Sequence, residues 1–241
     1  MQNRIKYFVM KRAVLCIVLL QPLVANADLL NHNFSVTYEV SRNGIYIGDT
    51  VRKFQQTPNG HWQYTSTTTA KGIAAMFISD VVRETSTLIQ KGNSIMPLTY
   101  RYDQSGGKEQ RHYQIDFLWD KQTIHTTDKN KDFKLEHNAQ DIQTFQLQIM
   151  RDMQLHKNTM AYFIANNDEA SSYTLTRNGH MKIETPLKSL ETIELVSNKI
   201  KENDQYRVWC APSFEFMPVR FQKTDSKGNK IEFSIKDFRL E

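Results

Sequence analysis

The chain has 241 residues and a formal net charge of +5, with 31 Lys and Arg against 26 Asp and Glu. Arg4, Lys6, Lys11 and Arg12 lie in the first 27 positions, which hold no acidic residue, so the remainder carries only about +1. Because basic and acidic side chains are interspersed along that remainder, it lacks the concentrated positive field of a nucleic-acid-binding protein, and we expect no nucleic-acid partner.

Residues 1–27 have the organisation of a secretory signal peptide. An apolar run from Ala13 to Val24 follows the basic start, and Ala25-Asn26-Ala27 is a small-x-small cleavage site. The apolar run is shorter than the roughly 20 residues of a membrane-spanning helix. Cys16 follows Leu15, where a lipoprotein signal needs a small residue. We therefore expect a cleaved signal peptide without a lipid anchor, followed by a single domain over residues 28–241.

Alternating apolar and polar residues run through almost all of this domain. Phe34, Val36, Tyr38 and Val40 alternate with polar residues, and Asn43-Gly44 then favours a tight hairpin turn. Further turns are expected at Asn59-Gly60, Gly92-Asn93, Gly106-Gly107, Asn178-Gly179 and Gly228-Asn229. The pattern predicts an all-β, mainly antiparallel domain, built as a strongly curved sheet or β-barrel-like structure with one packed α-helix.

The expected helix covers Asp141 to Leu155. Its apolar residues recur at helical spacing, and Asp141 or Asn138 can cap its first amides. These apolar residues are Ile142, Phe145, Ile149 and Met153.

A second segment, Gly72 to Ile78, is an apolar connection between two polar strands. It can cover a cavity mouth, insert at a membrane surface or plug the core. We favour the plug, because most apolar runs in soluble domains are buried.

Aromatic residues of the expected strands are the candidates for a ligand-binding site. A barrel of about eight or more strands can enclose a ligand, which here would be a lipid or a small apolar molecule. The candidate lining residues are Trp62, Tyr64, Phe77, Tyr113, Phe117 and Trp119. The alternative is a core filled by these same side chains.

No motif in the sequence indicates catalysis, a cofactor or a metal. The seven histidines show no close pair of the kind that zinc sites use, so we expect no metal site, no cofactor and no catalytic residue. The alternative is a hydrolase-like enzyme assembled from separated strands, in which His112 or Asp116 meets a partner in a pocket. Asp116 and Glu84 are the first carboxylates to consider. A further alternative is a structural subunit that docks onto an envelope protein partner through an exposed sheet edge, which would appear as a large apolar patch with no pocket.

The stretch from Trp209 to Arg220 joins two late strands through a corner that holds two prolines. Pro212 and Pro218 remove backbone donors, which predicts a bend between edge-like strands, with Trp209 and Val219 packed inward. Cys210, the one cysteine left after cleavage, is expected to be a buried apolar residue.

The order of several short motifs resembles an exported bacterial family, domain of unknown function 3108. These motifs are Tyr38-Glu39-Val40, Gly44, Gly48, Gly72, Glu84-x-Ser86, Pro97-x-x-Tyr100, Asp141-x-x-Thr144, Thr192, Trp209-x-x-Pro212 and Pro218-Val219-Arg220. Thr144 stands where a serine is more usual, and either hydroxyl suits a helix start. The resemblance implies a β-rich domain in the periplasm of a Gram-negative cell, and it implies no reaction. We therefore expect a noncatalytic binding or envelope-maintenance protein.

Overall fold

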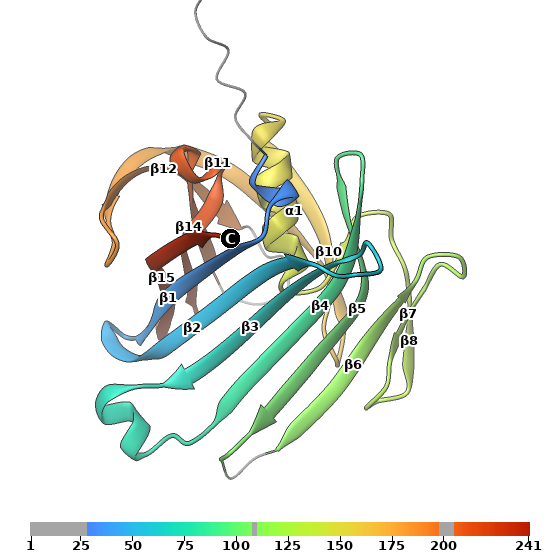
Figure 1. Cartoon of the computed structure of the whole chain (residues 1–241), viewed down its shortest axis with the longest axis horizontal. Helices are drawn as coiled ribbons and strands as arrows, with labels where there is room; N and C mark the ends of the chain where they lie inside the picture. The colour runs from blue at the N-terminus through green and yellow to red at the C-terminus, as the bar shows by residue number, and fades with distance from the viewer. Residues whose placement is uncertain (1–27, 108–109, 198–204) are drawn as a thin grey trace, which may run out of the picture.

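The computed structural model describes residues 28–107, 110–197 and 205–241, so the expected signal peptide and Cys16 lie outside the described residues. Within these ranges one sheet of 15 strands surrounds a single α-helix, α1 (Thr144–Gln154), as Figure 1 shows. The first strands are β1 (Phe34–Arg42), β2 (Ile45–Gln56), β3 (Trp62–Ala70), β4 (Val81–Lys91), β5 (Ser94–Ser105), β6 (Arg111–Leu118), β7 (Thr123–Thr126) and β8 (Lys131–Lys134). The others are β9 (Ala139–Gln140), β10 (Thr159–Ala165), β11 (Ala170–Glu184), β12 (Ser189–Ser197), β13 (Gln205–Ala211), β14 (Met217–Thr224) and β15 (Lys230–Leu240).

The sheet consists of two halves, β1 to β8 and β9 to β15, which are joined by the pairing of β1 with β15. We call these halves the first and the second meander. The order of the sheet is β8-β7-β6-β5-β4-β3-β2-β1-β15-β14-β13-β12-β11-β10-β9, and every neighbouring pair is antiparallel except β9 and β10. β8 and β9 form its two ends, so the sheet is strongly curved but not closed (Figure 1). This confirms the predicted fold class. No helix in the described ranges is long and apolar enough to cross a membrane.

Five of the six predicted glycine-containing turns lie between neighbouring strands. Asn43 and Gly44, with φ of 50° and 79°, form the two-residue turn between β1 and β2. The turn predicted at Asn178-Gly179 is wrong, because this pair lies inside β11. The pairing of β11 with β12 shifts between Arg177 and Gly179, so the glycine accommodates a β-bulge instead of a reversal.

Helix α1 is buried on nearly all sides. Leu147 and Met150 pack into one core cluster with residues of β1 to β5, while Phe145, Ile149 and Met153 pack into a second cluster with residues of β10 to β13. The curved sheet therefore uses α1 to fill much of its inner space.

Asp141, one of the two residues predicted to cap the helix, does cap the start of α1. Its Oδ1 accepts hydrogen bonds from the backbone amides of Gln143 and Thr144, both at 2.8 Å, and its own amide donates to Thr144 Oγ1 at 3.0 Å. This reciprocal pair is a capping box. Asn138 instead donates to the carbonyl of Ala161.

The first half of β5 is not paired with β6, because that pairing begins only at Thr99. Side chains from other elements hydrogen-bond to its backbone instead. The Ile95 amide donates to Gln148 Oε1 at 2.7 Å, and Gln140 Nε2 donates to the Ile95 carbonyl at 2.8 Å. The Trp119 indole donates to the Pro97 carbonyl at 2.7 Å. These bonds satisfy backbone groups of β5 that would otherwise be orphaned in the interior.

The predicted corner from Trp209 to Arg220 is the connection between β13 and β14, with a 3₁₀ turn, η3 (Pro212–Phe214). Trp209 and Val219 are buried as expected, and so is Cys210. The prediction of edge-like strands is wrong, because β13 and β14 lie inside the sheet. Pro218 is accommodated there because it lies beside the register shift at Trp209 and Cys210, where a β-bulge leaves a position without a ladder donor.

The apolar connection between β3 and β4 is exposed. It forms a short 3₁₀ helix, η2 (Gly72–Met76), with no buried residue, and Phe77 after it is 82% exposed. The preferred interpretation of this segment as a core plug is therefore wrong. Helix α1 and the strand side chains already fill the interior that the plug was expected to occupy.

Candidate functional site

A pocket of about 330 Å³ lies between the two flanks of the curved sheet, beside the start of α1. Tyr100, Tyr102 and Tyr113 of β5 and β6 form one wall, together with Glu84 of β4. The opposite wall and the ends come from α1 and the second meander, with Ile142, Phe145, Tyr162, Ile164, Ala165, Asn166, Tyr173, Leu175, Ser197, Tyr206, Val208 and Phe221. Its volume falls within the usual range for small-molecule sites, and its lining is mostly apolar and aromatic.

Glu84 is the one charged side chain among the described residues that line this pocket. Tyr100 donates its hydroxyl to Glu84 Oε1 at 2.8 Å. Burial raises the pKa of Tyr113 to about 12 and also raises the pKa of Tyr100, since a phenolate would be poorly solvated there. These tyrosines therefore remain neutral hydroxyls at neutral pH, and the Glu84 carboxyl lies among aromatic side chains.

A smaller cavity of about 180 Å³ adjoins the first and shares Glu84, Ile142, Phe145 and Phe221 with it. It adds a cation, Arg52 of β2. The Arg52 guanidinium lies 5.1 Å from the centre of the Tyr38 ring and 5.8 Å from that of Phe233, and it donates to Gln146 Oε1. Arg52 is thus held by two aromatic faces and the helix, a cation–π arrangement that favours a fixed position.

The buried Asp141 carboxyl supports the pocket from behind. Besides capping α1, its Oδ1 accepts the Ser86 hydroxyl at 2.9 Å, whereas Oδ2 has no hydrogen-bond partner among the described residues. Burial raises the pKa of Asp141 to about 6, although the hydrogen bonds from Thr144, Gln143 and Ser86 oppose the rise. This carboxyl fixes the helix start, and thereby Ile142 and Phe145 in the pocket wall.

The polar residues considered for an enzyme lie elsewhere. His112 Nδ1 is 3.2 Å from Asp103 Oδ2, and both side chains are at least half exposed. Asp116 accepts a hydrogen bond from Gln114 Nε2 at 2.6 Å. An open depression with Arg83, Arg101 and Thr127 contains the His112–Asp103 pair, but no Ser, Thr or Cys hydroxyl or thiol is hydrogen-bonded to His112 in the described chain. Within the same residues no group of three His, Cys, Asp or Glu side chains is arranged to hold a metal.

The six predicted ligand-binding residues lie in different surroundings. Tyr113 lines the pocket. Trp62 stacks on Phe54 with ring centres 4.6 Å apart, and Tyr64 is buried in the same core cluster.

The other three also lie outside the described pocket. Phe117 is buried among the residues of β5 to β7, and the Trp119 indole donates a hydrogen bond to the Pro97 carbonyl of β5. Phe77 lies on the surface because its segment leaves the sheet after β3. Trp62, Tyr64 and Phe117 therefore pack in the filled core and do not line the pocket.

The pocket residues that sequence reasoning missed come mainly from the second meander and the helix start. Tyr173, Leu175, Tyr206 and Val208 belong to strands that the alternation identified, and Glu84 was already a carboxylate to consider. Their meeting depends on β11 and β13 facing β5 across the curved sheet, and periodicity within one strand carries no information about such long-range proximity.

Comparison with known proteins gives two levels of similarity. A solved β-barrel-like protein of domain of unknown function DUF1849 from Brucella abortus matches at a TM-score of 0.57 and 6% identity, over 87% of this chain and 98% of that one. This likeness shows a shared fold. MucB of the Pseudomonas aeruginosa MucA/MucB complex matches at a TM-score of 0.39 and 10% identity, over 88% of this chain and 53% of that chain. No curated protein matches the sequence.

The family comparison covers most of the domain. The model of the family described as "Protein of unknown function (DUF3108)" matches residues 33–236. This range includes all the strands that line the pocket and the whole of α1. The chain therefore belongs to the DUF3108 family.

Proposed function

We propose that this protein is a noncatalytic binding domain of the periplasm that holds an amphipathic ligand in the tyrosine-lined pocket. The observation that carries the proposal is a mostly apolar pocket of about 330 Å³ inside the curved sheet, beside the close-packed body of α1. Natural interiors are close-packed, with few voids larger than a water molecule. A hollow of this size, with one carboxylate and several tyrosine hydroxyls, has the composition of a ligand site.

The charge of the pocket specifies the polar part of the ligand. Glu84 is its one charged residue among those described, and Tyr102 and Tyr113 stack beside it with ring centres 5.0 Å apart. A carboxylate repels an anionic head group, whereas a carboxylate beside aromatic faces stabilises an ammonium group. The ligand therefore places an amine or another hydrogen-bond donor at Glu84 and an apolar part between Phe145, Leu175 and Val208.

Native mass spectrometry of protein purified from its own periplasm, followed by lipid extraction, tests whether a ligand is carried. We expect one additional mass that organic extraction removes. Titration of the stripped protein with dodecylamine, dodecanol and dodecanoate, followed by tyrosine fluorescence, then tests the charge preference. Dodecylamine should bind most tightly, and failure of all three compounds to bind would contradict the proposal.

A substitution that fills the pocket provides a matched comparison. Leu175 lines the pocket and Thr176, the next residue of β11, is exposed. Leu175→Phe should weaken dodecylamine binding by about tenfold or more, since it occupies volume the alkyl chain needs. Thr176→Phe adds the same ring outside the pocket and should leave affinity unchanged. Equal affinities of the two variants would place the ligand elsewhere.

A further inference from the structure

Two neighbouring loops expose a group of large apolar side chains at one rim of the sheet. They are residues 42–47, at the turn between β1 and β2, and residues 71–78, which include η2; together we call them the apolar tip. The Lys71 amide donates to the Ile47 carbonyl at 3.1 Å, which holds the two loops together. The exposed apolar side chains are Ile45 at 70%, Tyr46 at 38%, Ile73 at 78%, Met76 at 78%, Phe77 at 82% and Ile78 at 42%.

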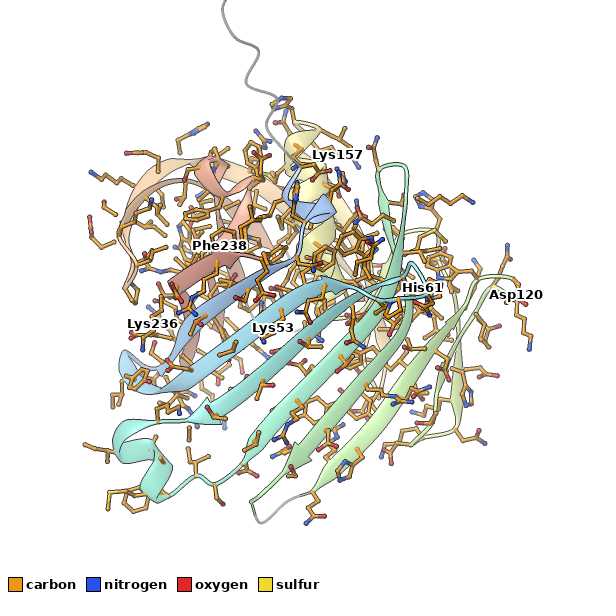
Figure 2. The ribbon with its side chains drawn as sticks, in the orientation of Figure 1. Lys53, His61, Asp120, Lys157, Lys236 and Phe238 are labelled. Atoms are coloured by element: carbon orange, nitrogen blue, oxygen red, sulfur yellow. The ribbon has the colours of Figure 1, made fainter. Side chains whose placement is uncertain are left out.

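The apolar tip has a defined conformation. Within the second loop, the amides of Phe77 and Ile78 both donate to the Ala74 carbonyl, at 3.0 and 2.9 Å. The Tyr46 hydroxyl donates to Asp49 Oδ1 at 3.1 Å, and Lys236, labelled in Figure 2, lies 5.7 Å from the Tyr46 ring centre. The backbone therefore holds Ile73, Met76 and Phe77 outward. Contiguous exposed apolar side chains of this kind mark an interaction site.

The charges of the apolar tip are positive. Residues 42–47 and 71–78 carry Arg42 and Lys71, both exposed, and no acidic residue. The carboxylates that follow the two loops along the chain have partners: Asp49 lies 3.4 Å from Lys236 Nζ, and Asp80 accepts a hydrogen bond from Gln104 Nε2 at 3.3 Å. Apolar side chains flanked by exposed cations complement a layer of anionic head groups above a hydrocarbon interior.

We propose that the apolar tip inserts into the surface of a bilayer that contains anionic phospholipid, and so anchors the protein there reversibly. The size of the tip favours a membrane over a protein partner. Two loops of six and eight residues are small beside the roughly 20 to 30 residues that each partner contributes to a standard interface. Individual side chains that project from a loop enter a fluid interface without a complementary pocket.

This inference is independent of the pocket, although the two features lie at the same end of the sheet. β4 begins at Val81, three residues after the last residue of the tip, and Glu84 follows three residues later opposite Tyr102 of β5. At about 3.3 Å per residue, the six residues from Ile78 to Glu84 place the pocket wall within roughly 20 Å of the end of the tip. A protein anchored through the tip therefore presents the Glu84 end of its pocket toward the membrane.

Co-sedimentation with vesicles tests the proposal on the exported protein. Vesicles of phosphatidylethanolamine with one quarter phosphatidylglycerol should bind the protein, and vesicles of phosphatidylcholine alone should bind it more weakly. The variant Ile73→Ser/Phe77→Ser should lose about tenfold or more in partitioning. Lys71→Gln should reduce binding at low salt, with little difference from the original at high salt.

The matched control is Leu240→Ser, since Leu240 is 60% exposed at the opposite end of β15 from the tip. It should bind vesicles as the unchanged protein does. Equal binding by Ile73→Ser/Phe77→Ser, with an unchanged melting temperature, would overturn the proposal. A concentration-dependent dimer abolished by the same double change would also overturn it and assign the tip to a second copy of the chain.

Discussion

The packing density inside the curved sheet differs between the body of α1 and the residues at its start. Along the body, Leu147, Ile149 and Met150 are at most 1% exposed and contact strands on both sides. Beside the start, Ile142 and Phe145 face a pocket of about 330 Å³. One helix thus closes part of a half-open barrel and leaves the rest hollow. The pocket is lined largely by aromatic side chains, whereas the body of the helix packs mainly against aliphatic residues and methionines.

Truncation in the filled region should have the largest effect. Trp209, 6% exposed, belongs to the same core cluster as Leu147 and Met150. Trp209→Ala should lower the free energy of unfolding by about 3 to 5 kcal/mol, because it leaves a cavity that the sheet cannot close. Urea denaturation measures this change. Trp62→Ala, at a partly buried ring stacked on Phe54, should cost less, and an unchanged midpoint for Trp209→Ala would contradict the assignment of this residue to the core.

The buried carboxyl at the boundary of the two regions makes stability depend on pH. Burial raises the pKa of Asp141 to about 6, against about 3.9 in an unfolded chain. The folded protein therefore holds this proton more tightly, so its contribution is fully present below about pH 4 and is lost as the pH rises through about 6. The loss amounts to about 3 kcal/mol.

The variant Asp141→Asn keeps an oxygen acceptor for the Gln143 and Thr144 amides but cannot ionise. The difference in unfolding free energy between the original protein and Asp141→Asn should fall from pH 4 to pH 7. Urea denaturation at each pH measures this difference. Other titrating groups cancel in this subtraction. A difference that stays constant over this range would show that Asp141 has an ordinary pKa.

Added volume should distinguish the two regions directly. Ile149→Phe, in the filled region, should cost about 1 to 3 kcal/mol by overpacking. Leu175→Phe should cost less than about 1 kcal/mol, because the larger ring can extend into the pocket that Leu175 lines. Thermal denaturation of both variants measures the contrast. Equal losses would mean that the pocket is filled in solution.

The smallest effect on folding is expected at the polar end of the pocket. Glu84→Gln preserves the shape of the side chain and an acceptor for the Tyr100 hydroxyl, and should change the unfolding free energy by less than about 1 kcal/mol. It should nevertheless weaken dodecylamine binding about tenfold while leaving dodecanol binding unchanged, because only the amine loses a charged partner. Equal losses for both ligands would show that Glu84 acts through the shape of the pocket.

Sequence reasoning reached the architecture because its signals are local. Strand alternation, the Asn43-Gly44 turn and the Asp141 cap each depend on residues close together in the chain, and all three are present in the structure. The pocket depends on strands far apart in sequence, so only Tyr113 of the predicted aromatic set lines it. The exposed η2 was mistaken for a plug because hydrophobicity alone does not distinguish buried residues from residues exposed for binding.

The hydrogen bonds from Gln140 and Gln148 to Ile95 have a further consequence during folding. An unpaired strand edge is a template for another chain, and edge-to-edge pairing leads to aggregation. Here two glutamine side chains block such an edge, and one of them arrives only when α1 docks. A chain with its sheet formed and its helix undocked would expose this part of β5 to its neighbours. Gln148 of α1 and Gln140 of β9 thus protect this part of β5 in the folded chain, and we expect the chain to be most prone to self-association before α1 docks.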